Sequence, residues 1–487
     1  MVKTNFALRI AVGALLALAG AGAEEVQPAM APATLELTVA EAVMMALQNN
    51  VSLRIERLQP VVREEYEQIE RAVFDPRLTA SAAADNLGGA DDGHAFEAQA
   101  GASRYFATGT TAAVVAGAGD YSSDGDDERA TSLDVQVTQA LLRGRGRDVN
   151  LARLHQAAID TRISRHELRG VAEALMASVE LAYWECVLAR EKIEIYHRSL
   201  AVAEQQIGEV REQINVGKLA ELELAASEAE VAEKREQLIA ARGDLAKRLL
   251  LFRRLANPTG GQWTRELRFL ERPEQPDVEL DDVENHVQLG IRNRADLRQA
   301  RLEVDRGELE VVRTRNGLLP RLDLFVRLGG TRYAESFAYR GDDHDWEAAA
   351  GLTLDFPLGR REEKARHRVA ELTLQQMEMA LANMEQIIQY DVRAAYVEVG
   401  IAREQILATA ATRKLRQDTL TAEQEKFRVG ASTTLLVAQA WRDLIASQIN
   451  EVEAVISLRK AMIGLYRLEG TLLERRGIAM AGATDLD

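Results

Sequence analysis

The sequence predicts an α+β protein of long helices and short strands, built from an internal tandem duplication. Three observations support this: a helix-favouring composition, two matching halves, and seven-residue apolar columns beside alternating strand patterns. Of 487 residues, 47% are apolar, only 5% are aromatic, and 9 are proline. Ample apolar content excludes a disordered chain, and the single cysteine excludes an intrachain disulfide framework.

The charge balance argues against nucleic acid as a partner. The chain has 60 basic and 76 acidic residues, which gives a net charge of −16. Proteins that bind nucleic acid need positive charge to neutralise phosphates, so this balance has the wrong sign for a general binder. We therefore predict no nucleic-acid partner.

The first 23 residues have the pattern of a secretory signal peptide. Lys3 and Arg9 precede the apolar run Ile10 to Ala19, and Ala21-Gly22-Ala23 offers a small-residue cleavage site. Past this point the sequence has no uncharged apolar run of about 18 residues, so we predict no membrane-spanning helix. An exported chain could then cross a membrane only as a closed β-barrel, because an open sheet leaves edge amides unpaired in lipid.

Two parts of the chain match each other, at an offset of 244 residues in the earlier segments and of 213 residues in the later ones. The matching pairs are Ala46 to Leu53 with Gly290 to Leu297, Pro76-Arg77-Leu78 with Pro320-Arg321-Leu322, Ala182-Tyr183 with Ala395-Tyr396, and Val216-Gly217 with Val429-Gly430. About a hundred residues around the last two pairs align without a gap, across a presumed turn. This indicates two copies of one structural unit.

Each copy is predicted to begin with a helix and to continue with strands. Thr38 is an N-cap candidate with Glu41 at the capping-box position, and the helical pattern continues to about Arg71. Apolar and polar residues then alternate, as in Leu133 to Thr138 and Leu322 to Leu328. Short strands with one polar face fit a water-filled barrel, and a half-buried soluble sheet gives the same alternation.

The longest predicted elements are two helical hairpins. From Val149 to Ile214, apolar residues fill the a and d positions of a seven-residue repeat. Such a helix is about 100 Å long at 1.5 Å per residue, so it must pack against other long helices. Gly217 ends it and Glu221 to Leu255 returns as a second helix. The second copy repeats this hairpin from Glu362 to Leu468, with Gly430 at the tip.

These elements predict a domain organisation along the chain. The predicted parts are a signal peptide (1–23), a first repeat (24–256, with strands in about 77–141 and a helical hairpin in about 149–255), an equatorial linker (257–280), a second repeat (281–473, with strands in about 321–357 and a helical hairpin in about 362–468), and a C-terminal tail (474–487).

In their order and duplication, these features resemble the TolC-like outer-membrane efflux family. The segments that carry the resemblance, between about Leu35 and Leu473, are Leu37 to Ala42, Ala46 to Asn50, Pro76, Pro320, Gln139 to Leu142, Phe356 to Leu358, and the hairpin tips Val216-Gly217 and Val429-Gly430. The resemblance implies a homotrimer in the outer membrane of a Gram-negative-type bacterium. Its shared β-barrel, with four strands from each subunit, would be continuous with a long α-helical barrel in the periplasm.

The resemblance also implies a function. The implied function is that of a passive outer-membrane exit channel in a tripartite efflux or type I secretion system. Such a channel receives substrates from an inner-membrane transporter and a periplasmic adaptor (membrane fusion) protein. The residues to which the resemblance assigns adaptor docking are Val216, Gly217, Leu219, Val429, Gly430, Ser432 and Leu435. A soluble periplasmic coiled-coil scaffold or adaptor is the alternative, because the long hairpins alone would suffice for it.

The strand region departs from the family pattern. The segment between Pro76 and Ala140 is longer than the one between Pro320 and Pro357. It contains two additional strand-like runs, Phe96 to Tyr105 and Gly109 to Gly119. Six strands per subunit, and a larger barrel, are therefore an alternative to the four that the resemblance implies.

The hairpin tips depart from the pattern as well. Leu436 and Gln439 stand where some relatives carry acidic residues around the periplasmic entrance. The first tip instead offers Glu221 and Glu223, which three-fold symmetry would multiply into a ring of carboxylates. The alternative is that they are solvated helix-start residues, which the helix dipole favours.

No residue pattern in the sequence predicts catalysis. The seven histidines lack metal-ligand spacing, and Cys186 lies in an apolar seam, as a small buried hydrophobe does. We therefore predict no enzyme activity, no cofactor and no metal. The basic run Arg143 to Arg147 is interpreted as an interfacial anchor in contact with outer-membrane lipid.

Overall fold

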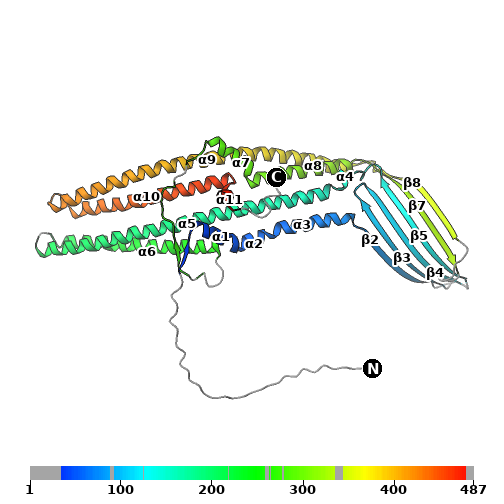
Figure 1. Ribbon diagram of the computed structural model, residues 1–487, viewed down its shortest axis with the longest axis horizontal. Helices are drawn as coiled ribbons and strands as arrows, with labels where there is room; N and C mark the ends of the chain where they lie inside the picture. Colours follow the sequence, from blue (N-terminus) through cyan, green and yellow to red (C-terminus); the bar gives the residue numbers. More distant parts are fainter. Residues whose placement is uncertain are drawn as a thin grey trace, which may run out of the picture.

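The computed structural model describes residues 34–87, 93–123, 126–217, 219–257, 263, 265–276, 279–334 and 344–478. A sheet of six strands lies at one end of a set of long helices, and the helical hairpin tips lie at the other end (Figure 1). The described part is thus a helix-rich α+β structure. The predicted signal peptide, 1–23, and most of the predicted tail lie outside the described residues.

Helices make up most of the described chain. The first half contains α1 (Val39–Asn49), α2 (Val51–Glu56), α3 (Leu58–Arg71), the short 3₁₀ helix η1 (Ala72–Phe74), α4 (Arg147–Asn150), α5 (Ala152–Asn215) and α6 (Leu222–Ala256). The second half contains α7 (Val283–Asn293), α8 (Ala295–Gly317), α9 (Arg361–Arg428), α10 (Thr434–Leu468) and α11 (Leu472–Arg475).

The first N-terminal helix begins where the capping pattern predicts, but the helical segment contains a break that the pattern did not predict. The Thr38 hydroxyl accepts a hydrogen bond from the Glu41 amide at 3.2 Å, and the Glu41 carboxylate accepts one from the Thr38 amide at 2.8 Å. This capping box starts α1. In place of one helix to Arg71, the chain leaves helical geometry at Asn50, whose side chain accepts from the Leu53 amide at 3.1 Å and so starts α2.

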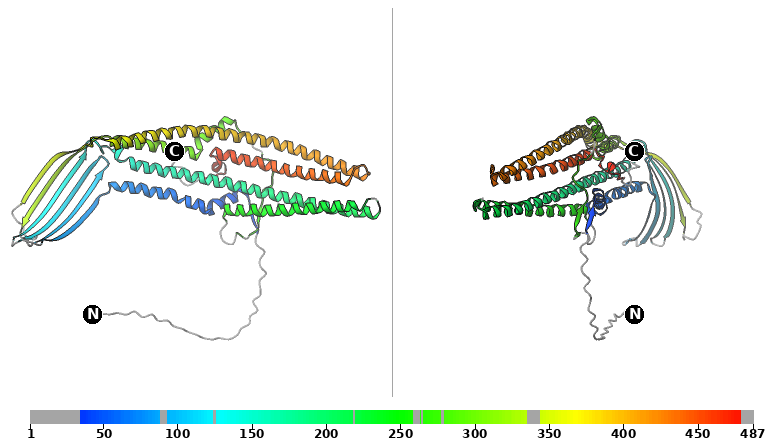
Figure 2. Two further views of the ribbon diagram at one scale, coloured as in Figure 1. Left: turned by 180° about the vertical axis from the view of Figure 1, so that it is seen from behind. Right: turned by 60° about the vertical axis from the view of Figure 1, so that its left-hand side comes forward.

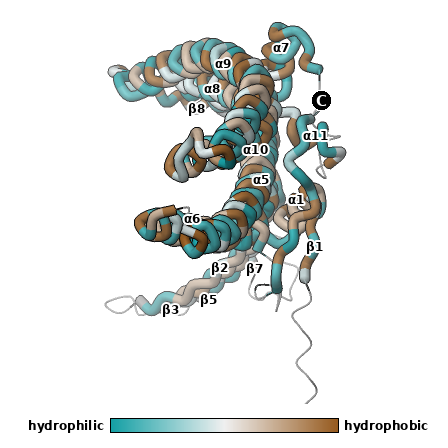
Figure 3. Tube along the Cα trace, turned by 90° about the vertical axis from the view of Figure 1, so that its left-hand side faces the viewer, coloured by the Kyte–Doolittle hydropathy of each residue, from teal (hydrophilic) through white to brown (hydrophobic). Residues whose placement is uncertain are grey.

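The long helices α5 and α9 each contact two shorter helices placed end to end. Helix α5 contacts α6 on the tip side and α3 on the sheet side, while α9 contacts α10 and α8 in the same way. Helices α8 and α10 also contact α5 and so join the two halves. The result is a wall of parallel helical columns (Figures 1 and 2). Helices α1, α7 and α11 lie on one side of this wall (Figure 3).

The sheet is a six-stranded antiparallel meander in the order β2-β3-β4-β5-β7-β8. Its strands are β2 (Arg77–Leu87), β3 (Gly93–Phe106), β4 (Thr110–Ser123), β5 (Asp126–Ala140), β7 (Arg321–Ala334) and β8 (His344–Asp355). The four strands implied by the resemblance are therefore wrong for this chain, and the alternative of six is correct. The difference is the β3–β4 hairpin, which occupies the longer segment of the first half.

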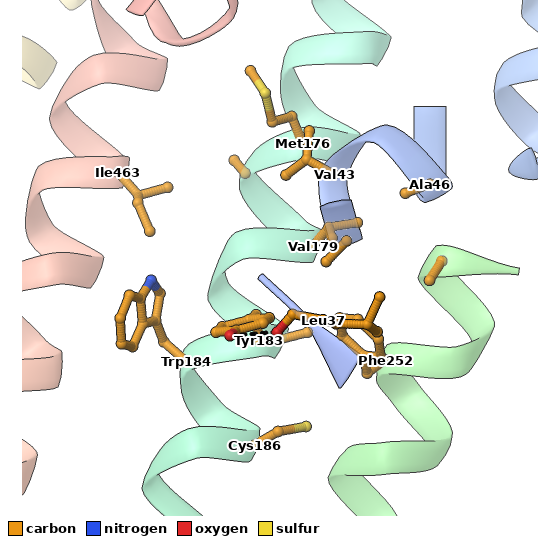
Figure 4. Packing of buried hydrophobic residues seen from close by; sticks show 14 of the residues in the cluster. Leu37, Val43, Ala46, Met176, Val179, Tyr183, Trp184, Cys186, Phe252 and Ile463 are labelled. Atoms are coloured by element: carbon orange, nitrogen blue, oxygen red, sulfur yellow. Dashed lines mark hydrogen bonds between the residues drawn. The ribbon is translucent and has the colours of Figure 1, made fainter. Parts of the chain in front are cut away.

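A second, small sheet ties the start of the described chain to the linker after α6. Strand β1 (Leu35–Leu37) pairs in parallel with β6 (Leu267–Phe269). The buried Tyr183 of α5 packs beneath this sheet, with its ring edge-on to Phe269 at 4.9 Å between centroids. The Tyr183 hydroxyl donates to the Leu37 carbonyl oxygen at 2.9 Å (Figure 4). Cys186 lies in the same core, which confirms its prediction as a buried residue.

Two ion pairs, each with one buried or mostly buried partner on α5, fix the C-terminal segment to the same core. The Arg476 guanidinium donates two hydrogen bonds, of 2.8 and 2.6 Å, to the fully buried Glu180 carboxylate of α5. Arg169 bridges to Glu474 at 2.9 Å. The middle of α5 is therefore held by both apolar packing and charge pairs.

Candidate functional site

One face of the six-stranded sheet is apolar across all six strands in its middle rows, while Arg104, Asp120, Arg129 and Arg332 lie on the same face nearer the strand ends. Cross-strand register places Val114, Val135, Leu328 and Ala348 in one row and extends the pattern in the rows beside it. The large exposed side chains on this face, here called the apolar face, are Leu78, Phe96, Phe106, Val114, Leu133, Val135, Val137, Leu324, Val326, Leu328, Trp346, Leu352 and Leu354. Leu133 is 54% exposed and Leu354 is 65% exposed. Contiguous apolar area of this kind marks a surface that another apolar phase covers.

The opposite face, here called the polar face, carries most of the charged side chains of the sheet. One row contains Asp134, Gly329 and Glu347. The Arg327 guanidinium bridges to the Asp134 carboxylate at 2.9 Å. A Cβ at Gly329 would lie 2.7 Å from the same carboxylate oxygen, so glycine makes room for this pair. The alternation of apolar and polar residues therefore holds across all six strands in the middle of the sheet.

Arginines and aromatic rings mark the helical end of the sheet. The Arg104 guanidinium lies 5.2 Å from the Phe106 ring centroid, and Arg360 lies 5.1 Å from that of Phe356. The run Arg143 to Arg147 follows β5 at this junction, and its three arginines are exposed. Aromatic and long basic side chains are enriched where a protein meets the membrane–water interface.

The two hairpin tips lie side by side at the other end of the molecule (Figures 1 and 2). Gly217 has a φ of 71° and Gly430 a φ of 78°, so both turns use the left-handed conformation that glycine adopts without strain. Val216 is 69% exposed, Val429 75% and Leu435 68%. These apolar tip residues have no cover within the described chain.

The remaining residues assigned to the tips are less accessible. Leu219 is half-buried, and the Ser432 hydroxyl donates to the Glu423 carboxylate at 2.7 Å. Glu423 therefore holds the second tip turn from within its own helix.

The two candidate ring carboxylates differ from each other. Glu221 is exposed and makes no side-chain cap at the start of α6. The Glu223 carboxylate instead accepts a hydrogen bond from the Thr434 hydroxyl at the start of α10. Further along the same helices, Arg442 bridges to Glu230 at 3.1 Å. The structure thus joins the tips through Glu223 and leaves Glu221 exposed.

The described residues contain no group of three or more metal-ligating side chains. Burial, with the charge of Asp244 nearby, raises the pKa of the Cys186 thiol to about 12. The thiolate is therefore not populated at neutral pH, which disfavours a nucleophilic role. Within the described ranges, none of the helices combines the length and apolar character needed to cross a membrane.

Sequence reasoning missed two features of this arrangement. The continuity of the apolar face through β2 to β4 was missed because alanines fill much of it there, and alanine alternation is a weak strand signal. The Glu223–Thr434 contact was missed because the two residues lie 211 positions apart. The two predicted tips stand at equivalent positions of the two repeats, and this was the only sequence signal that could have indicated a contact between them.

Comparisons with known proteins agree with this architecture. The sequence profile described as outer membrane efflux protein matches residues 42–257 and 287–471. No curated protein sequence matches the chain significantly.

Three solved membrane proteins share this fold: CusC, described for its transmembrane channel formation, the MtrE outer membrane channel and the outer membrane protein VceC. CusC has a TM-score of 0.68 and 16% identity, and covers 89% of this chain and 92% of its own. The MtrE outer membrane channel of Neisseria gonorrhoeae, in its open state, has a TM-score of 0.65 and 18% identity, with 89% of each chain covered. The outer membrane protein VceC of Vibrio cholerae has a TM-score of 0.66 and 14% identity, and covers 89% and 96%. The family profile spans most of the chain, which confirms the resemblance: the protein belongs to the outer membrane efflux protein family.

Proposed function

We propose that this protein is the outer-membrane exit channel of a tripartite efflux or type I secretion system. The two-faced sheet is the observation that supports this best, because a membrane barrel needs an apolar face toward lipid and a polar face toward water. Helix α9 has 68 residues, or about 100 Å at 1.5 Å per residue, enough to extend the channel far from the membrane. Solutes would pass through without any bond chemistry.

A barrel requires more than one copy of this chain. Strands β2 and β8 end the strand order, so each leaves one edge unpaired within the chain. Six strands fall short of the roughly eight in the smallest membrane barrels, and unpaired edges are not tolerated in lipid. Our proposal is a homotrimer in which β8 of one copy pairs with β2 of the next. Three copies of six strands would give a barrel of eighteen.

The tips are the proposed docking site for the periplasmic adaptor, which would link the channel to an inner-membrane transporter. Val216, Val429 and Leu435 support this, because they expose apolar side chains at or next to the tip turns. The tip turns would be shaped by Leu219, Ser432, Gly217 and Gly430. Glu221 and Glu223 remain candidates for a ring of carboxylates around the periplasmic entrance of the channel. We also infer that residues 24–256 and 281–473 are copies of one ancestral unit, which explains the paired tips.

Membrane fractionation and single-channel recording test the proposed function. The exported protein should remain in the outer membrane through an alkaline wash, elute in detergent with the mass of three chains, and conduct ions in a planar bilayer. Release by the wash as a monomer without conductance would favour the alternative, a soluble periplasmic scaffold, and would overturn the channel.

A tip variant tests adaptor docking separately. Val429→Glu with Leu435→Glu should leave the amount of trimer and its bilayer conductance unchanged, because both side chains are mostly exposed and pack against little of the fold. Export of substrate by cells should fall strongly. Unchanged export would place adaptor docking elsewhere.

A further inference from the structure

The β3–β4 hairpin is an addition to a pattern of four strands that continue into helices. Strand β2 follows α3 and η1, β5 leads to α4 and α5, β7 follows α8, and β8 leads to α9 (Figure 1). Strands β3 and β4 connect to no helix directly. The hairpin occupies residues 93–123, which are 31 residues, and the offset between the matched segments falls by the same number, from 244 to 213, across this region. The hairpin therefore accounts for the change in offset.

The turn of this hairpin is anchored where the sheet meets the helices. The Asn150 side-chain amide donates a hydrogen bond to the Ala107 carbonyl oxygen at 3.0 Å, and the Ala140 backbone amide donates to the Gly109 carbonyl oxygen at 3.0 Å. Gly109 has a φ of 87°, and a Cβ at this position would clash with the Gly144 carbonyl oxygen. The added hairpin is therefore built into the wall of the sheet.

With this hairpin the sheet is about as wide as the helical wall. On the sheet side the wall has four neighbouring columns, which are α3, α5, α8 and α9. At about 8–10 Å between axes, these columns span roughly 36 Å. Six strands about 4.8 Å apart and tilted by about 40° span roughly 38 Å around a barrel, whereas four strands span only about 25 Å. The hairpin thus lets the barrel continue the helical tube without narrowing.

The hairpin also adds width without filling it again, because its polar face carries no bulky side chain in the middle of the sheet. In the three middle rows this face presents Gln99, Gly101 and Ser103 on β3 and Ala113, Val115 and Gly117 on β4. None of these residues is charged or aromatic. The hairpin therefore enlarges the space that the polar face would enclose.

We propose that the β3–β4 hairpin sets the width of the channel exit and adapts it to bulky cargo, up to about 25 Å across. This inference rests on the proposed function, because it requires three copies to close a barrel with the polar face inside. Three six-stranded sheets enclose a diameter of about 36 Å between backbones, and side chains leave about 26 Å of it free. Four strands per copy would leave only about 14 Å, little more than the width of one α-helix.

Exclusion of polyethylene glycols of graded size from the channel in a planar bilayer measures this width. The polymers are added on the side that faces the barrel, and those that enter lower the conductance. We expect the wild-type channel to admit polymers of up to about 25 Å in hydrodynamic diameter.

Deletion of residues 93–123 should reduce this cut-off by nearly half, to about 15 Å. The deletion keeps the strand register, because Leu87, Gly93, Ser123 and Asp126 lie in one cross-strand row. Strand β2 can then pair directly with β5, with residues 88–92 and 124–125 as the connection. Each remaining residue keeps its face of the sheet.

Two tryptophan variants test the width in the full-length chain and decide the question if the deletion variant does not assemble. Gln99→Trp with Val115→Trp fills the polar face of the hairpin and should lower the cut-off to a value between those of the wild type and the deletion variant. The control Ala100→Trp with Val114→Trp changes the neighbouring residues on the apolar face and should leave the cut-off unchanged. The hairpin tips are the same in all variants, so a difference between them reports the barrel.

A wild-type channel that already excludes polymers of about 15 Å would overturn this inference and leave the proposed function standing. Equal cut-offs in the wild type and the polar-face tryptophan variant would do the same. A wild-type preparation that does not conduct at all would instead overturn the proposed function.

Discussion

Apolar side chains are buried in the middle of the helical wall, whereas on the sheet they are exposed. Around the middle of α5, Met176, Val179 and Tyr183 are fully buried within a single chain. On the sheet, Val135 and Leu328 are 38% and 54% exposed although they lie in a complete strand ladder. The first region is buried by the chain itself, whereas the apolar side chains of the second stay exposed in a single chain and, in the proposed channel, would be covered by lipid. This difference separates what stabilises the fold from what makes it a channel.

Tyr183→Ala should have the largest effect on stability, because it empties a site in the middle region. Loss of a buried aromatic side chain costs about 3–5 kcal/mol, and here the hydrogen bond to the Leu37 carbonyl is lost too. Tyr183→Phe keeps the packing and should cost only about 1 kcal/mol. Thermal unfolding in detergent compares the two, and equal losses would mean that the ring does not hold β1 and β6 to α5.

Val135→Arg tests whether the apolar face of the sheet contacts lipid. Instead of removing a buried side chain, it adds a charge to a surface that is exposed in the single chain. An arginine on the lipid side costs about 2–4 kcal/mol at the bilayer midplane. Gln136→Arg, the next residue on the same strand, faces the polar side and should be nearly neutral. The amount of each variant in the outer membrane measures the effect. Equal amounts of the two variants would contradict the assignment of the faces.

The sequence allowed the middle and the tips to be predicted better than the sheet. The seven-residue columns predicted α5, and their members Ala172, Val179 and Cys186 are indeed buried. Toward the tip the same column becomes half-buried at Ile207 and Ile214, because fewer elements cover the helix there. Periodicity therefore identified the helix but not how deeply each part of it is buried.

Two errors have identifiable physical causes. The strand number followed a family resemblance, and the added β3–β4 hairpin was recognised only as an alternative because glycine and alanine dominate it. The break between α1 and α2 was missed although Asn50 is a good helix-capping residue. An internal cap interrupts an apolar pattern that otherwise continues, so periodicity alone does not reveal it. Contacts between distant residues, such as Glu223 with Thr434, depend on tertiary packing.

Acidification should weaken the middle region through His166. Burial, helped by the charges of Arg298, Arg169 and Arg162, lowers the pKa of this histidine to about 4. The folded state therefore holds it neutral, while the unfolded chain takes up a proton near pH 6.5. The stability linked to His166 is complete above pH 6.5 and is lost as the pH falls toward 4.

His166→Gln is the matching variant for that pH dependence. It should flatten the decline of the unfolding midpoint between pH 6.5 and 4, because glutamine does not titrate. His155→Gln, at an exposed position on the same helix, should keep the wild-type slope. A wild-type slope in His166→Gln would assign the acid sensitivity to other groups.

The smallest effects should come from the tips, where little is buried and conformation alone matters. Gly430→Ala places a side chain at a φ of 78°, which should cost about 1–2 kcal/mol. Gly400→Ala, at an exposed interior position of α9, should instead stabilise the protein by up to about 1 kcal/mol, because alanine is the better helix former. The same substitution thus acts with opposite signs at two places along one hairpin. Hydrogen exchange of the α9 and α10 amides should resolve the two shifts, and a stabilising Gly430→Ala would show that the turn does not need its left-handed glycine.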